Sequence, residues 1–353
     1  MGEVDKLCAL FVGEKVFKVR WRPENIVGLD SQYFITGSWD FTENFLTVWK
    51  HSSDMDDPQQ LSSIPHEGDV TELKFINDNA CVASSSLGCV KLFSLDVTEE
   101  NSAQLKEHTT WEKLHSIRCM TECPCTGLAC FEEDIVTISE DGTLALLTAK
   151  RAIPVQKIDN ADAVSLSCIC FLKHNQVLTG NRVGGMKIWD FAGASQAPAA
   201  MFSLSSGQVG ASCVAHHPTQ SHIVFCGGED GSVTVWDLRQ NTFPVNVLKA
   251  HDGTVTELQF HPERPVHMFT SSTSGEIWNW DMSNLTGRPA PLRSGLTGDE
   301  NPWLGGDSVK HRLEIYSVMP RLHQPVNSFD LSGSKIVFSS DNEAIYVCKD
   351  VIT

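Results

Sequence analysis

The sequence lacks any uninterrupted apolar stretch that approaches the roughly 18 residues needed for a transmembrane helix. It also lacks an apolar signal region near its start, and Lys6 stands where an N-terminal myristoylation signal has Ser or Thr. Residues 350–353 contain no cysteine that could be prenylated. We therefore expect a soluble, intracellular protein with no membrane insertion.

Runs of basic residues are also absent. No block of five or more Lys and Arg residues occurs, and 27 Lys and Arg are outnumbered by 44 Asp and Glu. The formal net charge of −17 makes the surface repel phosphate-rich partners. This balance disfavours nucleic acid or an anionic membrane as a direct partner.

Motifs for catalysis and metal binding are missing too. The chain contains no nucleophile elbow, no phosphate-binding Gly loop and no metalloprotease helix motif. Its densest cysteine group matches no common zinc spacing and consists of Cys119, Cys123, Cys125 and Cys130. The other cysteines lie mostly in strand-like runs, which is typical of reduced, buried thiols. We predict no metal, no cofactor, no disulfide and no enzymatic activity.

The sequence does contain a short motif that recurs six times. Small polar residues lead into a Gly-containing turn and then an alternating strand that ends in a large apolar residue, as in residues 184–190 and 228–237. The final apolar positions are Trp49, Phe93, Leu147, Trp189, Trp236 and Trp280. This pattern resembles the WD repeat, which is about 40–45 residues long and forms one four-stranded propeller blade. A degenerate seventh unit covers residues 335–347. The resemblance implies an all-β fold, a seven-bladed WD-repeat β-propeller that occupies residues 1–353 as a single domain.

The two ends of the chain fit a closed ring. The last unit has only three predicted strands, at residues 326–331, 335–339 and 345–349, and residues 7–12 can supply the fourth. Closing the sheet in this way leaves no wide unpaired edge. We therefore predict a propeller closed by an N-terminal strand, and we expect the isolated protein to be monomeric.

Three stretches interrupt the repeat. Residues 283–310 form an irregular insertion in blade six, rich in Gly, Pro, Ser and Asn. Residues 96–108 in blade two, before a predicted strand at 111–117, and residues 52–60 in blade one are read the same way. Long loops without secondary structure are usually either functional or disordered. The sequence does not decide whether these three stretches contact a partner or have no function.

WD repeats often contain a polar network of His, Ser or Thr, Asp and Trp. Blade six has His251, Thr270 and Trp280, with Ser274 in place of the Asp. Blade five has Asp230 and Trp236, with Cys226 in place of the Ser or Thr and Gly207 in place of the His. We interpret these residues as structural positions and not as a binding site. The inner strands are expected to be closely apolar, because both their faces lie between neighbouring blades.

One tetrapeptide favours a different function. Trp236-Asp237-Leu238-Arg239 resembles the Trp-Asp-x-Arg ending found in substrate receptors of cullin-type ubiquitin ligases. That resemblance implies an adaptor contact through Arg239. The alternative is that the arginine has no special role, since Arg two places after a Trp-Asp pair is common in propellers.

Several short segments outside the repeat consensus resemble those of a more specific family, the small WD-repeat nucleoporins of the Y-shaped nuclear pore scaffold. They include residues 20–23, 36–44, 124–127, 158–162, 248–251 and 343–347. The similarity spans residues 11–347, although the blade-six insertion is shorter here and differs in sequence. The resemblance implies a non-enzymatic scaffold subunit that docks on an α-solenoid nucleoporin and supports pore assembly and the transport of mRNA and protein. It also implies location at the nuclear envelope, with a kinetochore role in mitosis for animal members.

Overall fold

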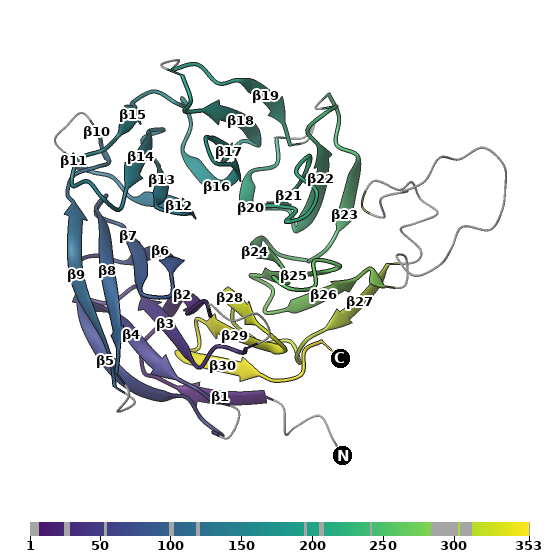
Figure 1. Cartoon of the computed structure of the whole chain (residues 1–353). Helices are drawn as coiled ribbons and strands as arrows, with labels where there is room; N and C mark the ends of the chain where they lie inside the picture. Colours follow the sequence, from purple (N-terminus) through teal and green to yellow (C-terminus); the bar gives the residue numbers. More distant parts are fainter. Residues whose placement is uncertain are drawn as a thin grey trace.

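The computed structural model contains seven four-stranded antiparallel sheets that surround a common centre as the blades of a propeller (Figure 1). The predicted all-β, seven-bladed fold is thus confirmed. The structure describes residues 7–24, 29–52, 55–98, 102–117, 121–193, 196–204, 208–240, 242–283, 303 and 313–352.

In blades one to six, the strands run from the centre to the rim in chain order. Blade one contains β2 (Val16–Trp21), β3 (Tyr33–Ser38), β4 (Asn44–Lys50) and β5 (Gln59–His66). Blade two contains β6 (Val70–Asn77), β7 (Ala80–Ser85), β8 (Val90–Val97) and β9 (Ala103–Trp111). A small hairpin of β10 (Ser116–Ile117) and β11 (Thr121–Glu122) follows. Blade three contains β12 (Cys125–Phe131), β13 (Asp134–Ser139), β14 (Leu144–Thr148) and β15 (Gln156–Ile158).

The second half of the ring repeats this order. Blade four contains β16 (Leu166–Lys173), β17 (Gln176–Asn181), β18 (Gly185–Asp190) and β19 (Ala200–Ser203). Blade five contains β20 (Ala211–His216), β21 (Ile223–Gly228), β22 (Ser232–Asp237) and β23 (Asn246–Lys249). Blade six contains β24 (Val255–Phe260), β25 (His267–Ser272), β26 (Ile277–Asp281) and β27 (Glu314–Ser317).

Blade seven joins the two ends of the chain. It contains β28 (Val326–Ser332), β29 (Lys335–Ser340), β30 (Ala344–Cys348) and, as its outer strand, β1 (Leu7–Phe11). β1 pairs antiparallel with β30, from Leu7 opposite Cys348 to Phe11 opposite Ala344. The predicted closure by the N-terminal strand is therefore present, and it covers an edge of β30 that would otherwise be unpaired (Figure 1).

The apolar core is divided among the seven junctions between neighbouring blades. Each junction holds one cluster of buried side chains, for example Phe225 and Val235 of blade five against Met268 of blade six. The six final apolar positions of the repeat are all at most 4% exposed, and they are Trp49, Phe93, Leu147, Trp189, Trp236 and Trp280. Each lies in the cluster shared with the preceding blade. In blade seven, Cys348 occupies the corresponding place, opposite Ile336 and in the cluster shared with blade six.

Two of the three predicted interruptions differ in the structure. Residues 96–108 are not an irregular insertion, because β8 and β9 form a long hairpin in which Asp96 pairs with Gln104. The fourth strand predicted at residues 111–117 is therefore wrong, since the outer strand of blade two ends at Trp111. In blade one, β5 already begins at Gln59, which shortens the expected loop at 52–60. The sequence missed both strands because outer strands face water and carry polar residues at alternate positions.

The insertion predicted at residues 283–310 lies outside the described residues, apart from Ser283 and Trp303. Trp303 is only 4% exposed and belongs to the cluster between blades five and six. Its ring meets that of Phe225 edge to face, with 4.8 Å between centroids. This side chain thus contributes to the core of the propeller.

Candidate functional site

The polar network of blade six is assembled as the sequence predicts. The Trp280 indole donates a hydrogen bond to Thr270 Oγ1 at 2.9 Å, and that oxygen lies 2.8 Å from Nε2 of His251. The Thr270 hydroxyl can therefore donate to the imidazole while it accepts from the indole. Glu276, and not Ser274, stands beside the other ring nitrogen, with 3.6 Å between His251 Nδ1 and Glu276 Oε2. All three network side chains are buried, so the arrangement braces the blade and offers nothing to a ligand.

Other blades keep only part of this network. Trp49 donates to Thr36 at 2.9 Å and Trp189 donates to Thr179 at 3.0 Å. In blade five, where Cys226 replaces the threonine, the Trp236 indole N–H has no hydrogen-bond partner among the described residues. Gly207 lies outside the described residues. Asp230 stabilises only its own turn, where its Oδ1 accepts from the Ser232 backbone N–H at 3.0 Å.

Blade three contains a comparable network that its repeat motif does not indicate. His115 is fully buried, with Nε2 at 3.0 Å from Thr137 Oγ1 and Nδ1 at 2.5 Å from Thr143 Oγ1. Burial lowers the pKa of His115 to about 4, so the imidazole is neutral at physiological pH. The signal was a His that precedes an inner strand, but blade three ends in Leu147 and so lacks the tryptophan that would have drawn attention to it.

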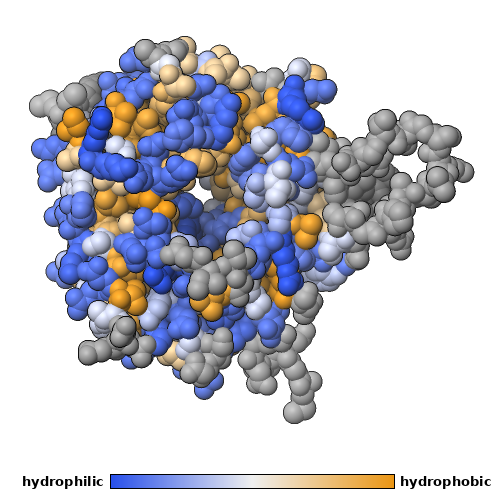
Figure 2. Space-filling model, viewed as in Figure 1, coloured by the Kyte–Doolittle hydropathy of each residue, from blue (hydrophilic) through white to orange (hydrophobic). Residues whose placement is uncertain are grey.

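The second group of polar residues surrounds the centre of the disc, where Figure 2 shows a hollow with hydrophilic residues around it. Arg20 of β2 is 4% exposed, and its Nη2 lies 2.6 Å from Glu257 Oε1 and 2.9 Å from Glu72 Oε1. Its Nη1 donates to Ser328 Oγ at 2.8 Å. These partners belong to β24, β6 and β28, so one guanidinium connects the inner strands of blades six, seven, one and two. The expectation of closely apolar inner strands is wrong here, because alternate side chains of these strands meet one another at the centre.

Electrostatics differ sharply among the carboxylates near Arg20. Burial alone would raise the pKa of Glu257, but the charges of Arg20, Lys18 and Lys74 outweigh it and hold the pKa at about 2. Glu257 Oε2 also accepts from Ser328 Oγ at 2.8 Å and from the Phe329 backbone N–H at 3.1 Å. By contrast, burial raises the pKa of Asp330 to about 6. The charged side chains at the centre thus pair mainly with one another.

We expect the free energy of unfolding to fall as the pH is lowered from about 4.5 toward 2. The folded-state pKa of Glu257 is about 2 and its ordinary value is 4.5, so in this interval the unfolded chain binds more protons than the folded one. The stabilisation is complete above pH 4.5 and is lost as the pH falls through the folded pKa. Urea unfolding of the wild type and of Glu257→Gln across this range checks the prediction. The raised pKa of Asp330 acts in the opposite sense, and because the charge of Glu257 contributes to it, this opposing effect is smaller in the variant. An equally steep pH dependence in the variant would contradict our interpretation.

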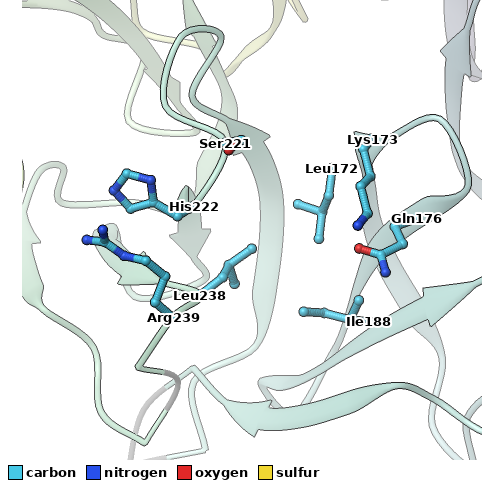
Figure 3. Close-up of a pocket in the computed structure, with 8 residues that line it drawn as sticks. All are labelled: Leu172, Lys173, Gln176, Ile188, Ser221, His222, Leu238 and Arg239. Atoms are coloured by element: carbon cyan, nitrogen blue, oxygen red, sulfur yellow. The ribbon is translucent and has the colours of Figure 1, made fainter.

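The Trp-Asp-x-Arg tetrapeptide lies at the end of β22 in blade five. Asp237 Oδ2 accepts from Arg239 Nη2 at 2.6 Å, and Asp237 Oδ1 accepts from Arg239 Nε at 2.9 Å. The Arg239 side chain is nevertheless 62% exposed. It lies at the border of a pocket of about 310 Å³ between blades four and five (Figure 3). Among the residues singled out in the sequence, Arg239 combines an exposed functional group with a place beside a concave surface.

The dense cysteine group does not form a metal site in the described part of the chain. Cys123 and Cys125 are buried, Cys130 is partly buried, and Cys119 lies outside the described residues. Burial raises the pKa of Cys125 and of Cys130 to about 12, which disfavours the thiolate that zinc requires. Among the described residues, no cluster of three or more His, Cys, Asp or Glu side chains could hold a metal ion.

Comparison with known proteins identifies the family of this chain. The family model of the WD domain, G-beta repeat, matches residues 201–237 and 242–281, each match ending at a Trp-Asp pair. The described residues include no helix that is long and apolar enough to span a membrane. "Nucleoporin Nup43" of Homo sapiens is 36% identical to this chain over 383 aligned positions, which cover 99% of the chain and 100% of that protein. The Mus musculus protein of the same name is also 36% identical, with the same coverage. "Nuclear pore complex protein nup43" of Dictyostelium discoideum is 23% identical and covers 91% of the chain. The chain belongs to the Nup43 family of WD-repeat nucleoporins.

Proposed function

We propose that this chain is a non-enzymatic scaffold subunit of the nuclear pore complex. In this role it joins the Y-shaped subcomplex, docks on an α-solenoid nucleoporin and supports pore assembly and the transport of mRNA and protein. The observation that carries the proposal is the 36% identity over 99% of the chain to the two mammalian Nup43 nucleoporins. It supports location at the nuclear envelope.

The architecture supports this role. The seven inter-blade clusters and the charge network at the centre make the propeller a rigid disc, which suits a subunit that holds partners in fixed positions. The polar networks of the blades are buried and occupied in bracing strands, so they supply no reacting group. The excess of 44 Asp and Glu over 27 Lys and Arg supports protein partners, and not direct contact with nucleic acid.

The test is affinity purification of the tagged full chain at moderate salt, with identification of the proteins that accompany it. Co-purification of Y-complex nucleoporins, including one with an α-solenoid fold, together with fluorescence at the nuclear rim is the expected result. Imaging in mitotic cells tests the kinetochore role that the resemblance implies for animal members. Failure to enrich at the nuclear envelope, with no nucleoporin recovered, would overturn the proposal.

We predict that Arg239→Ala leaves nucleoporin co-purification and rim localisation unchanged. A ligase receptor that relied on this arginine would lose an anchor worth about 2 kcal/mol or more. A scaffold subunit held over a broad surface would lose little, and Asp237 already engages Nε and Nη2 of Arg239. The variant is first compared with the wild type by circular dichroism and thermal melting to show that it is folded. Loss of a cullin adaptor from the folded variant would instead favour the ubiquitin-ligase alternative.

A further inference from the structure

The pocket beside Arg239 lies where strand ends of two neighbouring blades meet. Leu172 and Lys173 are the last two residues of β16 in blade four, and His222 comes from the segment before β21 of blade five. Leu238 and Arg239 follow β22 of blade five. Figure 3 shows the side chains of the two blades on opposite sides of the pocket. Its volume of about 310 Å³ is at the lower end of the range for ligand pockets, enough for one large side chain with adjacent backbone.

The pocket has an apolar floor that is continuous with the core. Leu172, Ile188 and Leu238 line it, and all three pack against the buried cluster between blades four and five. That cluster includes the fully buried Trp236. The floor is therefore held in place by the propeller itself and is preformed, so a ligand that binds there does not have to order it.

The border of the pocket carries cationic side chains, although the whole chain has a formal charge of −17. It contains Lys173, His222 and Arg239. Two carboxylates are near: Asp237, which is bonded to Arg239 Nε and Nη2, and Asp190, whose Oδ2 accepts from Gln176 at 2.9 Å. Within the described residues, Lys173 forms no ion pair, and none of the bonds to Arg239 uses its Nη1. Asp237 therefore orients the guanidinium and leaves donors available to a second anion.

We propose that this pocket binds an acidic peptide segment of a partner protein, with one large apolar side chain inserted between two carboxylates. The apolar side chain would contact Leu172, Ile188 and Leu238, and the carboxylates would meet Lys173 and Arg239. Charge complementarity selects this occupant, because a purely apolar ligand leaves the cations unused and a bare phosphate leaves the apolar floor exposed to water. This binding site is a proposal separate from the scaffold role, and it can be tested without any nuclear pore partner.

The experiment uses the full chain labelled at Ile, Leu and Val methyl groups and followed by NMR. The probe is the peptide acetyl-Glu-Asp-Phe-Asp-Glu-amide, titrated to millimolar concentration. Saturable shifts are expected at the methyls of Leu172, Ile188 and Leu238. An otherwise identical peptide with Gln and Asn in place of the acids should bind at least about tenfold more weakly, as should one with Ala in place of Phe.

Two charge-reversal variants provide the matched comparison. Lys173→Glu changes an exposed lysine of the pocket, and Lys249→Glu changes an exposed lysine on the outer strand of blade five, away from the pocket. We expect Lys173→Glu to weaken the acidic peptide at least about tenfold and Lys249→Glu to weaken it less than about twofold. Equal weakening by both variants, equal binding of the uncharged peptide, the same shifts with inorganic phosphate alone, or no shift at Ile188 would each overturn the proposal.

Discussion

Replacing Arg20 by methionine is expected to lower the free energy of unfolding by about 3–5 kcal/mol, the usual cost of removing one partner from a buried ion pair. Methionine fills much of the space of the arginine stem but leaves Glu257 buried without the cation 2.6 Å away, and Glu72 without the one 2.9 Å away. Since a whole domain is stable by only about 5–15 kcal/mol, this loss should be conspicuous. Urea unfolding followed by circular dichroism at neutral pH measures it.

The control for Arg20→Met is a lysine whose ion pair is exposed. Lys106 lies 2.8 Å from Asp96, but its side chain is 65% exposed, so Lys106→Met should cost less than about 1 kcal/mol. A double variant, Arg20→Met with Glu257→Gln, should be less destabilised than the sum of the two single variants, because it removes the unpaired charge together with its partner. Wild-type stability for Arg20→Met would show that the central charges do not hold the ring together.

The blades could be predicted from the sequence because each repeats a local pattern. Trp189, Trp236 and Trp280 end alternating strands at similar spacing, and a strand that alternates must bury one face. The same reasoning failed for β9, where Ala103 and Leu105 are buried but Gln104 and residues 106–108 are polar and exposed. A rim strand meets water along one edge and face, so its alternation is weak and resembles a loop.

The central network and the pocket could not be predicted in this way. Arg20 meets Glu72 and Glu257, which lie 52 and 237 positions away along the chain. Which of the many charged residues converge depends on the register of four separate inner strands, and no local periodicity encodes it. The pocket similarly depends on side chains of two blades, and the motifs that contain Ile188, Leu238 and Arg239 do not show that these residues meet Leu172 and Lys173.

Removing residues 1–13 is expected to destabilise the protein by several kcal/mol and to make it self-associate. β1 pairs with β30 along five residues, and the Val12 N–H donates to Glu343 O at 2.9 Å just beyond the strand. Leu10 and Val12 pack against the cluster between blades seven and one. Fully burying such a side chain is worth about 1.5–3 kcal/mol, and these partly buried side chains are each worth somewhat less. The truncation also exposes the edge of β30, which can then pair with another copy.

Thermal melting and light scattering after size-exclusion chromatography measure the two consequences of that truncation separately. Two point variants in the full chain test whether buried side chains of the N-terminal segment account for the lost stability. Leu10→Ala removes a side chain that packs on the core, whereas Phe11→Ala removes one that is 70% exposed. We expect Leu10→Ala to lower the melting temperature clearly and Phe11→Ala to change it little. If the truncated protein melts at the wild-type temperature and remains monomeric, pairing of β1 with β30 does not stabilise the ring, and blade seven is stable with three strands.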